Sequence, residues 1–184
     1  MESYGDIATC AAVDSGLVYV RRLFPSSTHV YEVKRGGESY VLKVTPIKSR
    51  LRVKSLKNES RILTLAKDLE GITHLVNDYG GVGGFYGILK EYFEGQSLLE
   101  LGIRISDEKL KEYLRAVFQK LHSLHIARLD PEEKNIVVSS DCTKARLVDL
   151  DHSETFFKFS QYNPFSDFRQ QKSRDLRMLE MLFD

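Results

Sequence analysis

Short runs of hydrophobic residues, several of them alternating with polar residues, dominate the first part of the chain. Three runs rich in β-branched and aromatic residues cover positions 17–20, 30–33 and 40–44, a composition typical of β-strands. The connection at residues 34–38 contains two adjacent glycines and indicates a hairpin turn between the second and third runs. This pattern predicts three strands of a sheet.

A helix and two further strands are predicted next. Apolar residues recur at helical spacing within residues 51–69, and Gly71 is expected to cap the end of this helix. Strand-like runs at 74–79 and 85–89 flank a glycine cluster at 80–84. The cluster lacks the complete GxGxxG spacing and no helix follows it, so a hairpin turn is favoured over a phosphate-binding loop. The first half of the chain is thus expected to form five strands, with one helix after the third.

The second half of the chain is mainly helical in pattern. Ser106 is expected to be the N-cap of a long helix, because apolar residues at 110–124 recur at helical intervals. Two short apolar runs at 135–138 and 146–150, separated by a polar turn, predict a second hairpin. Helical spacing returns at 173–183 and predicts a terminal helix.

Composition and charge exclude few functions. The 184 residues are 42% hydrophobic and 29% charged, as in an ordinary globular protein. The formal net charge is +1, from 27 basic and 26 acidic side chains, so the whole molecule creates no strong field that attracts nucleic acid or membrane. The local basic segment 48–57 is either a phosphate-facing or RNA-facing patch or the solvated approach to a helix, and the latter is the favoured interpretation.

The two cysteines indicate the compartment. Cys10 and Cys142 lie far apart and have no CxxC or Cys/His spacing, which argues against a zinc site or a disulfide framework. The N-terminal residues do not resemble a signal peptide, and no run approaches the roughly 20 apolar residues of a membrane span. We therefore predict a reducing, cytoplasmic location, with the nucleus as an alternative, and no membrane partner.

Lys43 is the first residue along the chain that could take part in phosphoryl transfer. Phosphoryl transfer requires cations on the phosphates, oxygen ligands for Mg²⁺ and a carboxylate near the attacking hydroxyl. Lys43 lies inside a predicted strand, where a buried charge would need a partner, and Glu59 on the following helix could supply one. Taken alone, Lys43 is also explained as the polar face of an edge strand.

A second group of polar residues follows the long helix. Asp130 and Asn135 are separated by four residues on the loop before the predicted hairpin, and Asp149 follows its second strand. Because a hairpin places its outer ends together, Asn135 and Asp149 could jointly hold a divalent cation through oxygen ligands. Each residue alone is equally explained as a solvated loop residue.

The order of these residues resembles that of the protein kinases. Lys43 in YVLKV, Glu59 sixteen residues later, LKEYFEG at 89–95, LDPEEKN at 129–135 and VDLD at 148–151 are similar to the kinase signature in chain order. The resemblance covers roughly residues 16–183.

This resemblance implies an α+β, bilobal fold that binds ATP and Mg²⁺ between its lobes. The N-lobe, residues 1–92, would contain a five-stranded antiparallel sheet with one helix. The C-lobe, residues 93–184, would be reduced and mainly helical, so that the two lobes form one kinase-like domain.

The resemblance also implies which residues bind the nucleotide. Lys43 would contact the α- and β-phosphates and would be held in place by Glu59. Glu91 and Phe93 lie in the segment that resembles the interlobe hinge, and their backbone groups would contact adenine.

The remaining implied roles concern the metal and the acceptor. Asp130 would orient or deprotonate the acceptor hydroxyl. Asn135 and Asp149 would bind Mg²⁺. The implied activity is that of an atypical ATP-dependent phosphotransferase similar to serine/threonine protein kinases, or of an ATPase.

Within the superfamily the chain resembles small atypical kinases. Only about 25 residues separate Asp149 from Asp175, too few for a conventional activation segment. This brevity, with the sequences at 58–63 and 175–183, is similar to the RIO family and more closely to the kinase subunit of the KEOPS complex. That resemblance implies a protein partner subunit, and tRNA reached through a complex.

Three departures leave other functions open. Residues 24–28 replace the glycine-rich loop, Arg128 stands where the catalytic-loop histidine is expected, and Asp151 replaces the glycine after the metal-binding aspartate. Asp151 either binds a second cation or faces solvent, and the latter is favoured. A pseudokinase that acts as a binding or scaffold module, and a kinase for a small molecule or sugar, are therefore the alternatives.

Overall fold

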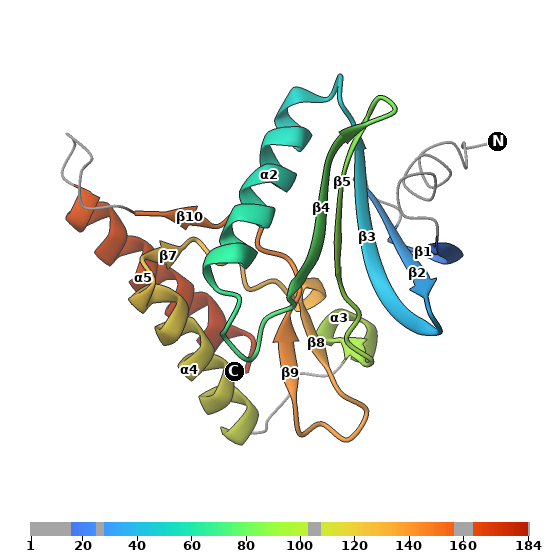
Figure 1. Cartoon of the computed structure of the whole chain (residues 1–184). Coiled ribbons are helices and arrows are strands. Elements are labelled where there is room, and N and C mark those ends of the chain that lie inside the picture. Colours follow the sequence, from blue (N-terminus) through green and yellow to red (C-terminus); the bar gives the residue numbers. More distant parts are fainter. Residues whose placement is uncertain (1–15, 25–27, 103–107, 157–163, 184) are drawn as a thin grey trace. The chain divides into compact units, whose positions relative to one another are not determined.

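The structure is a computed structural model of the chain and describes residues 16–24, 28–102, 108–156 and 164–183 (Figure 1). These residues form two compact units. The first comprises the described residues up to Ser60 together with His74–Tyr92, and the second comprises Arg61–Thr73 with the described residues from Phe93 onward. Residues 61–73, which the sequence assigned to the first lobe, therefore group with the second unit.

The first unit contains the predicted five-stranded antiparallel sheet. Its strands are β1 (Val18–Phe24), β2 (His29–Arg35), β3 (Glu38–Pro46), β4 (Leu75–Val82) and β5 (Phe85–Glu91). Their order is β1-β2-β3-β5-β4, and all neighbouring strands are antiparallel. The α+β class and the sheet predicted from the strand-like runs are thus confirmed.

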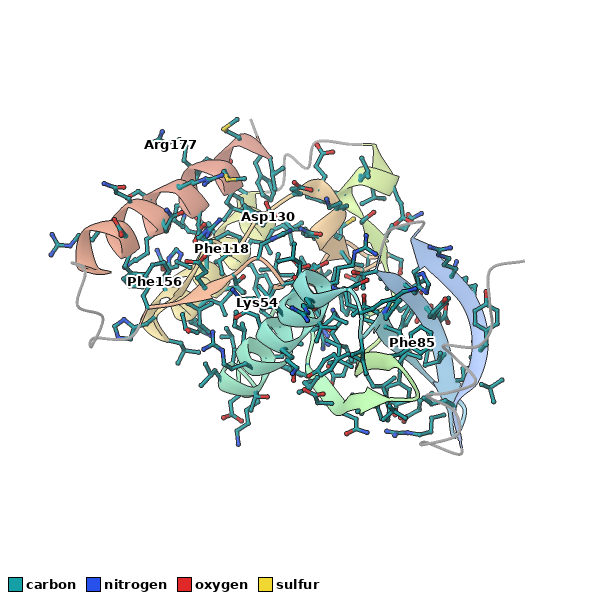
Figure 2. The ribbon with its side chains drawn as sticks, turned by 90° about the horizontal axis from the view of Figure 1, so that it is seen from above. Lys54, Phe85, Phe118, Asp130, Phe156 and Arg177 are labelled. Carbon is teal, nitrogen blue, oxygen red and sulfur yellow. The ribbon has the colours of Figure 1, made fainter. Side chains whose placement is uncertain are left out.

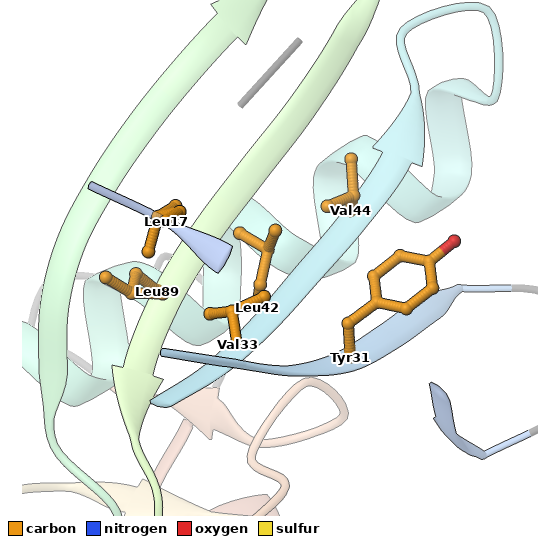
Figure 3. Close-up of a cluster of buried hydrophobic side chains, with 6 residues drawn as sticks. All are labelled: Leu17, Tyr31, Val33, Leu42, Val44 and Leu89. Atoms are coloured by element: carbon orange, nitrogen blue, oxygen red, sulfur yellow. The ribbon is translucent and has the colours of Figure 1, made fainter. Parts of the chain in front are cut away.

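The two faces of this sheet bury different residues because side chains alternate along a strand. On one face, six buried side chains from β2, β3, β5 and the residue before β1 form a hydrophobic cluster (Figure 3): Leu17, Tyr31, Val33, Leu42, Val44 and Leu89. On the other face, Tyr86 and Ile88 pack with Leu56 of α2 (Arg50–Leu65). Alternation places Lys43 on the α2 face, between the cluster residues Leu42 and Val44 in sequence.

The glycine cluster forms a plain hairpin, as predicted. Strand β4 continues through Gly80 and Gly81, and only Gly83 and Gly84 connect it to β5. Both connecting glycines have positive φ, at 54° and 87°, which their lack of a Cβ permits.

The expected C-cap at Gly71 is wrong. Helix α2 ends at Leu65 rather than near residue 69, and the chain passes through a turn in which the N–H of Leu69 donates to the carbonyl oxygen of Ala66 at 2.9 Å. Gly71 has a φ of +90°, and a Cβ there would lie 2.3 Å from Cγ2 of Val117. The glycine is required because α4 approaches its backbone closely.

The second unit is built around two long helices, α4 (Glu108–Ser123) and α5 (Pro164–Met181), which pack against each other. A short helix α3 (Leu98–Leu101) begins with a capping box, in which Ser97 accepts from the N–H of Glu100 and the Glu100 carboxylate accepts from the N–H of Ser97. Such reciprocal bonds satisfy backbone donors that a helix start leaves unpaired. The terminal helix starts at residue 164 rather than 173, so the prediction was too short. Ser106 lies outside the described residues.

Short strands surround the loop between these helices. Strands β6 (Gln96–Ser97), β8 (Ile136–Val138) and β9 (Ala145–Leu147) form one sheet, which confirms the second hairpin. Strand β7 (Ile126–Ala127) pairs with β10 (Glu154–Thr155), and the single 3₁₀ turn η1 covers Glu133–Asn135. No helix in the described part of the chain is both long and apolar enough to cross a membrane.

Replacing Gly71 should test the close approach of α4. We expect Gly71→Ala to lower the free energy of unfolding by roughly 2–4 kcal/mol, since it combines an unfavourable φ with overpacking. Gly84→Ala is the matched control, because Gly84 has a φ of +87° and a Cβ added there would meet no atom within 4 Å. It should cost about 1 kcal/mol. Equal losses in denaturant unfolding of the two variants would contradict the steric explanation.

Candidate functional site

The first unit buries the charged pair that the sequence singled out. Lys43 lies in the middle of β3 and Glu59 on α2, and the Lys43 Nζ is 2.9 Å from Glu59 Oε2. Both side chains are almost fully inaccessible to solvent. The strand forms here because the neighbouring side chains of β3 fill the hydrophobic cluster, and its alternation directs Lys43 toward the helix. The structure therefore forms the Lys43–Glu59 ion pair.

A second lysine binds the same carboxylate and was missed from the sequence. Lys90, on β5, places its Nζ 2.6 Å from Glu59 Oε1 and is only 2% exposed. Its cross-strand partner is Val41, two residues from Lys43, so the two lysines share one face. The sequence did contain a signal for this position: Lys90 lies two residues after Ile88 on the same strand, so it faces α2 as Ile88 does.

These three residues form a buried cluster of two cations and one anion. Burial of charge is costly unless each group is paired, and here one carboxylate uses both oxygens to bind two ammonium groups. Lysine ammonium groups held in this way are of the kind that binds a negatively charged ligand such as a phosphate group.

Glu91 and Phe93, the two residues expected at the hinge, belong to different units and have different contacts. The N–H of Glu91 donates to the carbonyl oxygen of His74 at 2.9 Å, and its carboxylate lies 3.1 Å from His74 Nδ1. That N–H is therefore not available to adenine. Phe93 belongs to the second unit, where the guanidinium of Arg146 lies 5.0 Å from its ring centroid. The adenine contacts of both residues remain predictions.

The second unit presents Asp130 on a strained loop. His125, Arg128 and Asp130 have φ values of 59°, 61° and 47°, a left-handed conformation that costs non-glycine residues free energy. Three such residues within six positions persist only where neighbouring contacts fix the backbone. Figure 2 shows Asp130 among the side chains of this unit.

Asp175 of α5 supplies those contacts. Its Oδ2 accepts from the N–H of Arg128 at 3.0 Å and its Oδ1 from the N–H of Leu129 at 3.1 Å. The His122 Nε2 on α4 lies 2.9 Å from Oδ2, and both side chains are buried. The sequence analysis missed this role, although Asp175 lies four residues before the buried Leu179 and so on the buried face of the helix.

Asp130, Asn135 and Asp149 come together beside this loop. The Asn135 Nδ2 donates to the carbonyl oxygen of Asp130 at 3.0 Å, and the N–H of Val148 donates to the carbonyl oxygen of Asn135 at 2.9 Å. Asn135 is buried, whereas the other two are partly exposed. The hairpin thus places its outer ends together.

The local field raises the pKa of Asp130. Burial is the main cause, and the carboxylates of Glu132 and Asp149 raise it further, while His152 and Lys134 lower it. A carboxylate with a raised pKa is a better proton acceptor than an ordinary aspartate. Asp130 is therefore suited to accept a proton from a hydroxyl group.

The donor set fits Mg²⁺. The hydrogen bond from Asn135 Nδ2 leaves its Oδ1 as the oxygen able to bind a cation, and Asp149 adds a carboxylate. No group of three or more His, Cys, Asp or Glu side chains arranged for a metal occurs in the described part of the chain. Two oxygen donors suit Mg²⁺, which usually keeps waters and takes further ligands from phosphates.

Two of the three departures from the kinase pattern lie in this unit. Arg128 forms an ion pair with Glu154, which lies across the small sheet from β7. The N–H of Asp151 donates to Asp149 Oδ1 at 3.2 Å, and the Asp151 carboxylate lies 3.6 Å from His152 Nε2. The third departure falls mostly in residues 25–27, outside the described part of the chain.

Substitutions of Glu59 and Lys90 should lower the stability of the protein by different amounts. Glu59→Gln would remove the buried carboxylate that both lysines bind and should destabilise the protein by roughly 3–5 kcal/mol. Lys90→Met leaves one cation paired with one anion, so we expect a loss under about 2 kcal/mol. Denaturant unfolding measures both, and an equal loss in the two variants would show that charge balance is not the determining factor.

The comparisons with known proteins identify the fold. The sequence matches no protein-family model and no curated protein. Among solved structures, the chain is similar to the PK-1 kinase of the Cydia pomonella granulovirus, with a TM-score of 0.65 and 20% sequence identity. The match covers 85% of this chain and 59% of the viral kinase. An identity this low establishes the fold alone, and the chain has a protein-kinase-like α+β fold.

Proposed function

We propose that the chain is an atypical ATP-dependent phosphotransferase of the protein-kinase type. The supporting observation is the Asp130 loop, in which three residues have positive φ, the Asp175 carboxylate holds the backbone, and Asn135 donates to the carbonyl oxygen of Asp130. Strain of this kind is retained at functional sites when surrounding contacts over-determine it. ATP and Mg²⁺ are the proposed substrate and metal.

In this proposal the first unit binds phosphate. Lys43 donates to the α- and β-phosphates while Glu59 holds its ammonium group in place. Lys90 binds the other oxygen of Glu59, so the carboxylate stays fully paired when Lys43 turns part of its hydrogen bonding toward a phosphate. A cation on the phosphates offsets part of the negative charge of the nucleotide.

The second unit acts on the acceptor. Bound Mg²⁺ would neutralise charge on the phosphates, and Asn135 and Asp149 are the residues that would hold it. Asp130 accepts a hydrogen bond from the acceptor hydroxyl and orients its oxygen toward the γ-phosphorus. When that oxygen forms the new P–O bond and the bond to the β–γ bridging oxygen breaks, ADP leaves and Asp130 takes the hydroxyl proton. Catalysis is therefore electrostatic positioning.

The KEOPS-type role is a narrower proposal. Its support is the sequence similarity at 58–63 and 175–183, together with the short segment between Asp149 and the terminal helix. It would make the chain a subunit that binds a protein partner and supports tRNA modification. Stimulation of ATP turnover by tRNA and a partner subunit would favour this role over that of an independent protein or sugar kinase.

The alternative function is that of a pseudokinase scaffold. The observation that favours it is the ion pair between Arg128 and Glu154, because Arg128 replaces the histidine expected in the catalytic loop. A scaffold would show neither a thermal shift with ATP and Mg²⁺ nor ATP turnover. A Mg²⁺-dependent shift with turnover would exclude it.

Removing the proposed metal ligand tests the activity. We expect Asp149→Asn to reduce Mg²⁺-dependent ATP turnover on the order of a hundredfold or more, since an amide cannot replace the carboxylate charge. Asp141→Asn is the matched control, because Asp141 lies in the exposed β8–β9 turn and binds only local groups there. Equal turnover in wild type, Asp149→Asn and Asp141→Asn would refute the proposed site.

The raised pKa of Asp130 predicts the acid limb of the pH profile. Only the carboxylate form accepts a proton, so kcat/KM should rise with pH through a midpoint above the ordinary value of 3.8. Glu132→Gln removes a carboxylate that raises this pKa and should move the midpoint to lower pH. Lys134→Met removes a cation that lowers it and should move the midpoint to higher pH. Shifts in the same direction for both variants would exclude Asp130 as the titrating group.

A further inference from the structure

Helix α5 presents an arginine face to solvent. Arg169, Arg174 and Arg177 are exposed, and within the described residues their guanidinium groups form no ion pair. At 100° per residue these three positions span an arc of about 140°, opposite the buried Asp175 and Leu179. Figure 2 shows Arg177 projecting from the outer side of this helix.

The other end of α5 differs. There Glu180 accepts from Arg115 and lies 2.9 Å from Lys111 Nζ, so the cations of α4 are paired. Lys111 and Arg115 of α4 are thus neutralised by Glu180 where α4 meets α5. The three arginines of α5, by contrast, have no ion pair among the described residues.

A cavity joins this arginine face to the proposed catalytic loop. It has a volume of about 290 Å³, and the residues that line it include Asp130, Arg128, His152, Gln171 and Arg174. A neighbouring hollow of about 490 Å³ shares Gln171 and Arg174 with it and continues to Arg169 and Arg177. The two hollows are neighbours along α5, and together they are called the path below; Asp130 lines one end of it.

The position of Arg174 in this path is fixed by the fold. The next residue, Asp175, accepts hydrogen bonds from the backbone of Arg128 and Leu129. The turn of α5 that includes Arg174 is therefore tied to the loop that ends in Asp130.

Gln171 is one of the residues that line both hollows. Its Oε1 is buried and has no hydrogen-bond donor among the described residues. A buried acceptor without a donor is costly, and native proteins usually satisfy such groups.

We propose that this path binds the phosphoryl acceptor and that the acceptor bears a sugar phosphate group. The inference rests on the proposed function and defines the substrate class of the same site. Arginine matches phosphate because its planar fork donates two parallel hydrogen bonds. Asp130 accepts a hydrogen bond from a hydroxyl group of the sugar, while Arg174 binds the phosphate.

The sugar phosphate group could belong to a small molecule or to a single-stranded RNA, and the length of the arginine face distinguishes the two. Arg169 and Arg177 are eight residues apart, which corresponds to about 12 Å along the helix. A small sugar phosphate would occupy only the cavity beside Asp130. A single-stranded RNA would place successive ribose phosphates along the whole face, and its binding would then depend on Arg169 and Arg177 as well.

The test is direct binding of two probes, ribose 5-phosphate and a short single-stranded oligoribonucleotide, measured by calorimetry on the full chain. Arg174→Gln should weaken both probes about tenfold to a hundredfold. Arg115→Gln, which removes an arginine charge on α4, should leave both unchanged. An Arg169→Gln/Arg177→Gln variant should weaken the oligoribonucleotide alone if RNA is the source, and neither probe if the source is small.

Two outcomes would overturn the inference. One is equal binding of the probes by wild type and Arg174→Gln, with both proteins equally stable to heat. The other is equal binding of a poly-glutamate peptide, which would show recognition of negative charge rather than of sugar phosphate. ATP turnover measured on the same variants separates this inference from the proposed function. If wild type turns over ATP but Arg174→Gln binds the probes as wild type does, only the acceptor class is refuted. If wild type does not turn over ATP, the phosphotransferase function itself is refuted.

Discussion

The buried carboxylate of Asp175 is the interaction on which the second unit depends. It joins α5 to the backbone of Arg128 and Leu129 and to His122 of α4. These bonds offset two costs at once, because they satisfy backbone donors that lie in irregular structure and they hold residues at positive φ. The position of Asp130 and the register of α5 beside it follow from the same carboxylate. Catalytic geometry and acceptor binding, as proposed here, thus depend on one side chain of a helix.

The first unit buries a cluster of charged side chains against its five-stranded sheet. One face of the sheet is a hydrophobic cluster, which provides stability, and the other places Lys43 and Lys90 on a single carboxylate. Buried ion pairs contribute little net stability compared with hydrophobic residues of the same size. The three charged residues there are consistent with the proposed phosphate binding. A third charge also keeps Glu59 paired whichever lysine engages a ligand.

Much of the fold follows from local periodicity in the sequence. The five strands, the three hairpins and the main helices were predicted because alternation and helical spacing are local properties. Gly71 was misassigned because its role depends on Val117 of a helix over forty residues away. Lys90 and Asp175 were missed for a related reason: each is one polar residue on an apolar face, and its partners lie on other elements. Lys43 and Asp130 were found only because their order along the chain resembles that of kinases.

The near-neutral net charge conceals a separation of charge that orients an acceptor. Burial and then the carboxylate of Glu132 raise the pKa of Asp130, whereas His152 and Lys134 lower it. The Asp130 carboxylate itself repels an anionic group and accepts a hydrogen bond from a hydroxyl. The arginine face of α5 begins in the lining of the same cavity. A ligand with a phosphate at one end and hydroxyls at the other has one electrostatically favourable orientation, in which the reacting hydroxyl meets the carboxylate. Specificity of this kind depends on where the charges lie and not on their sum.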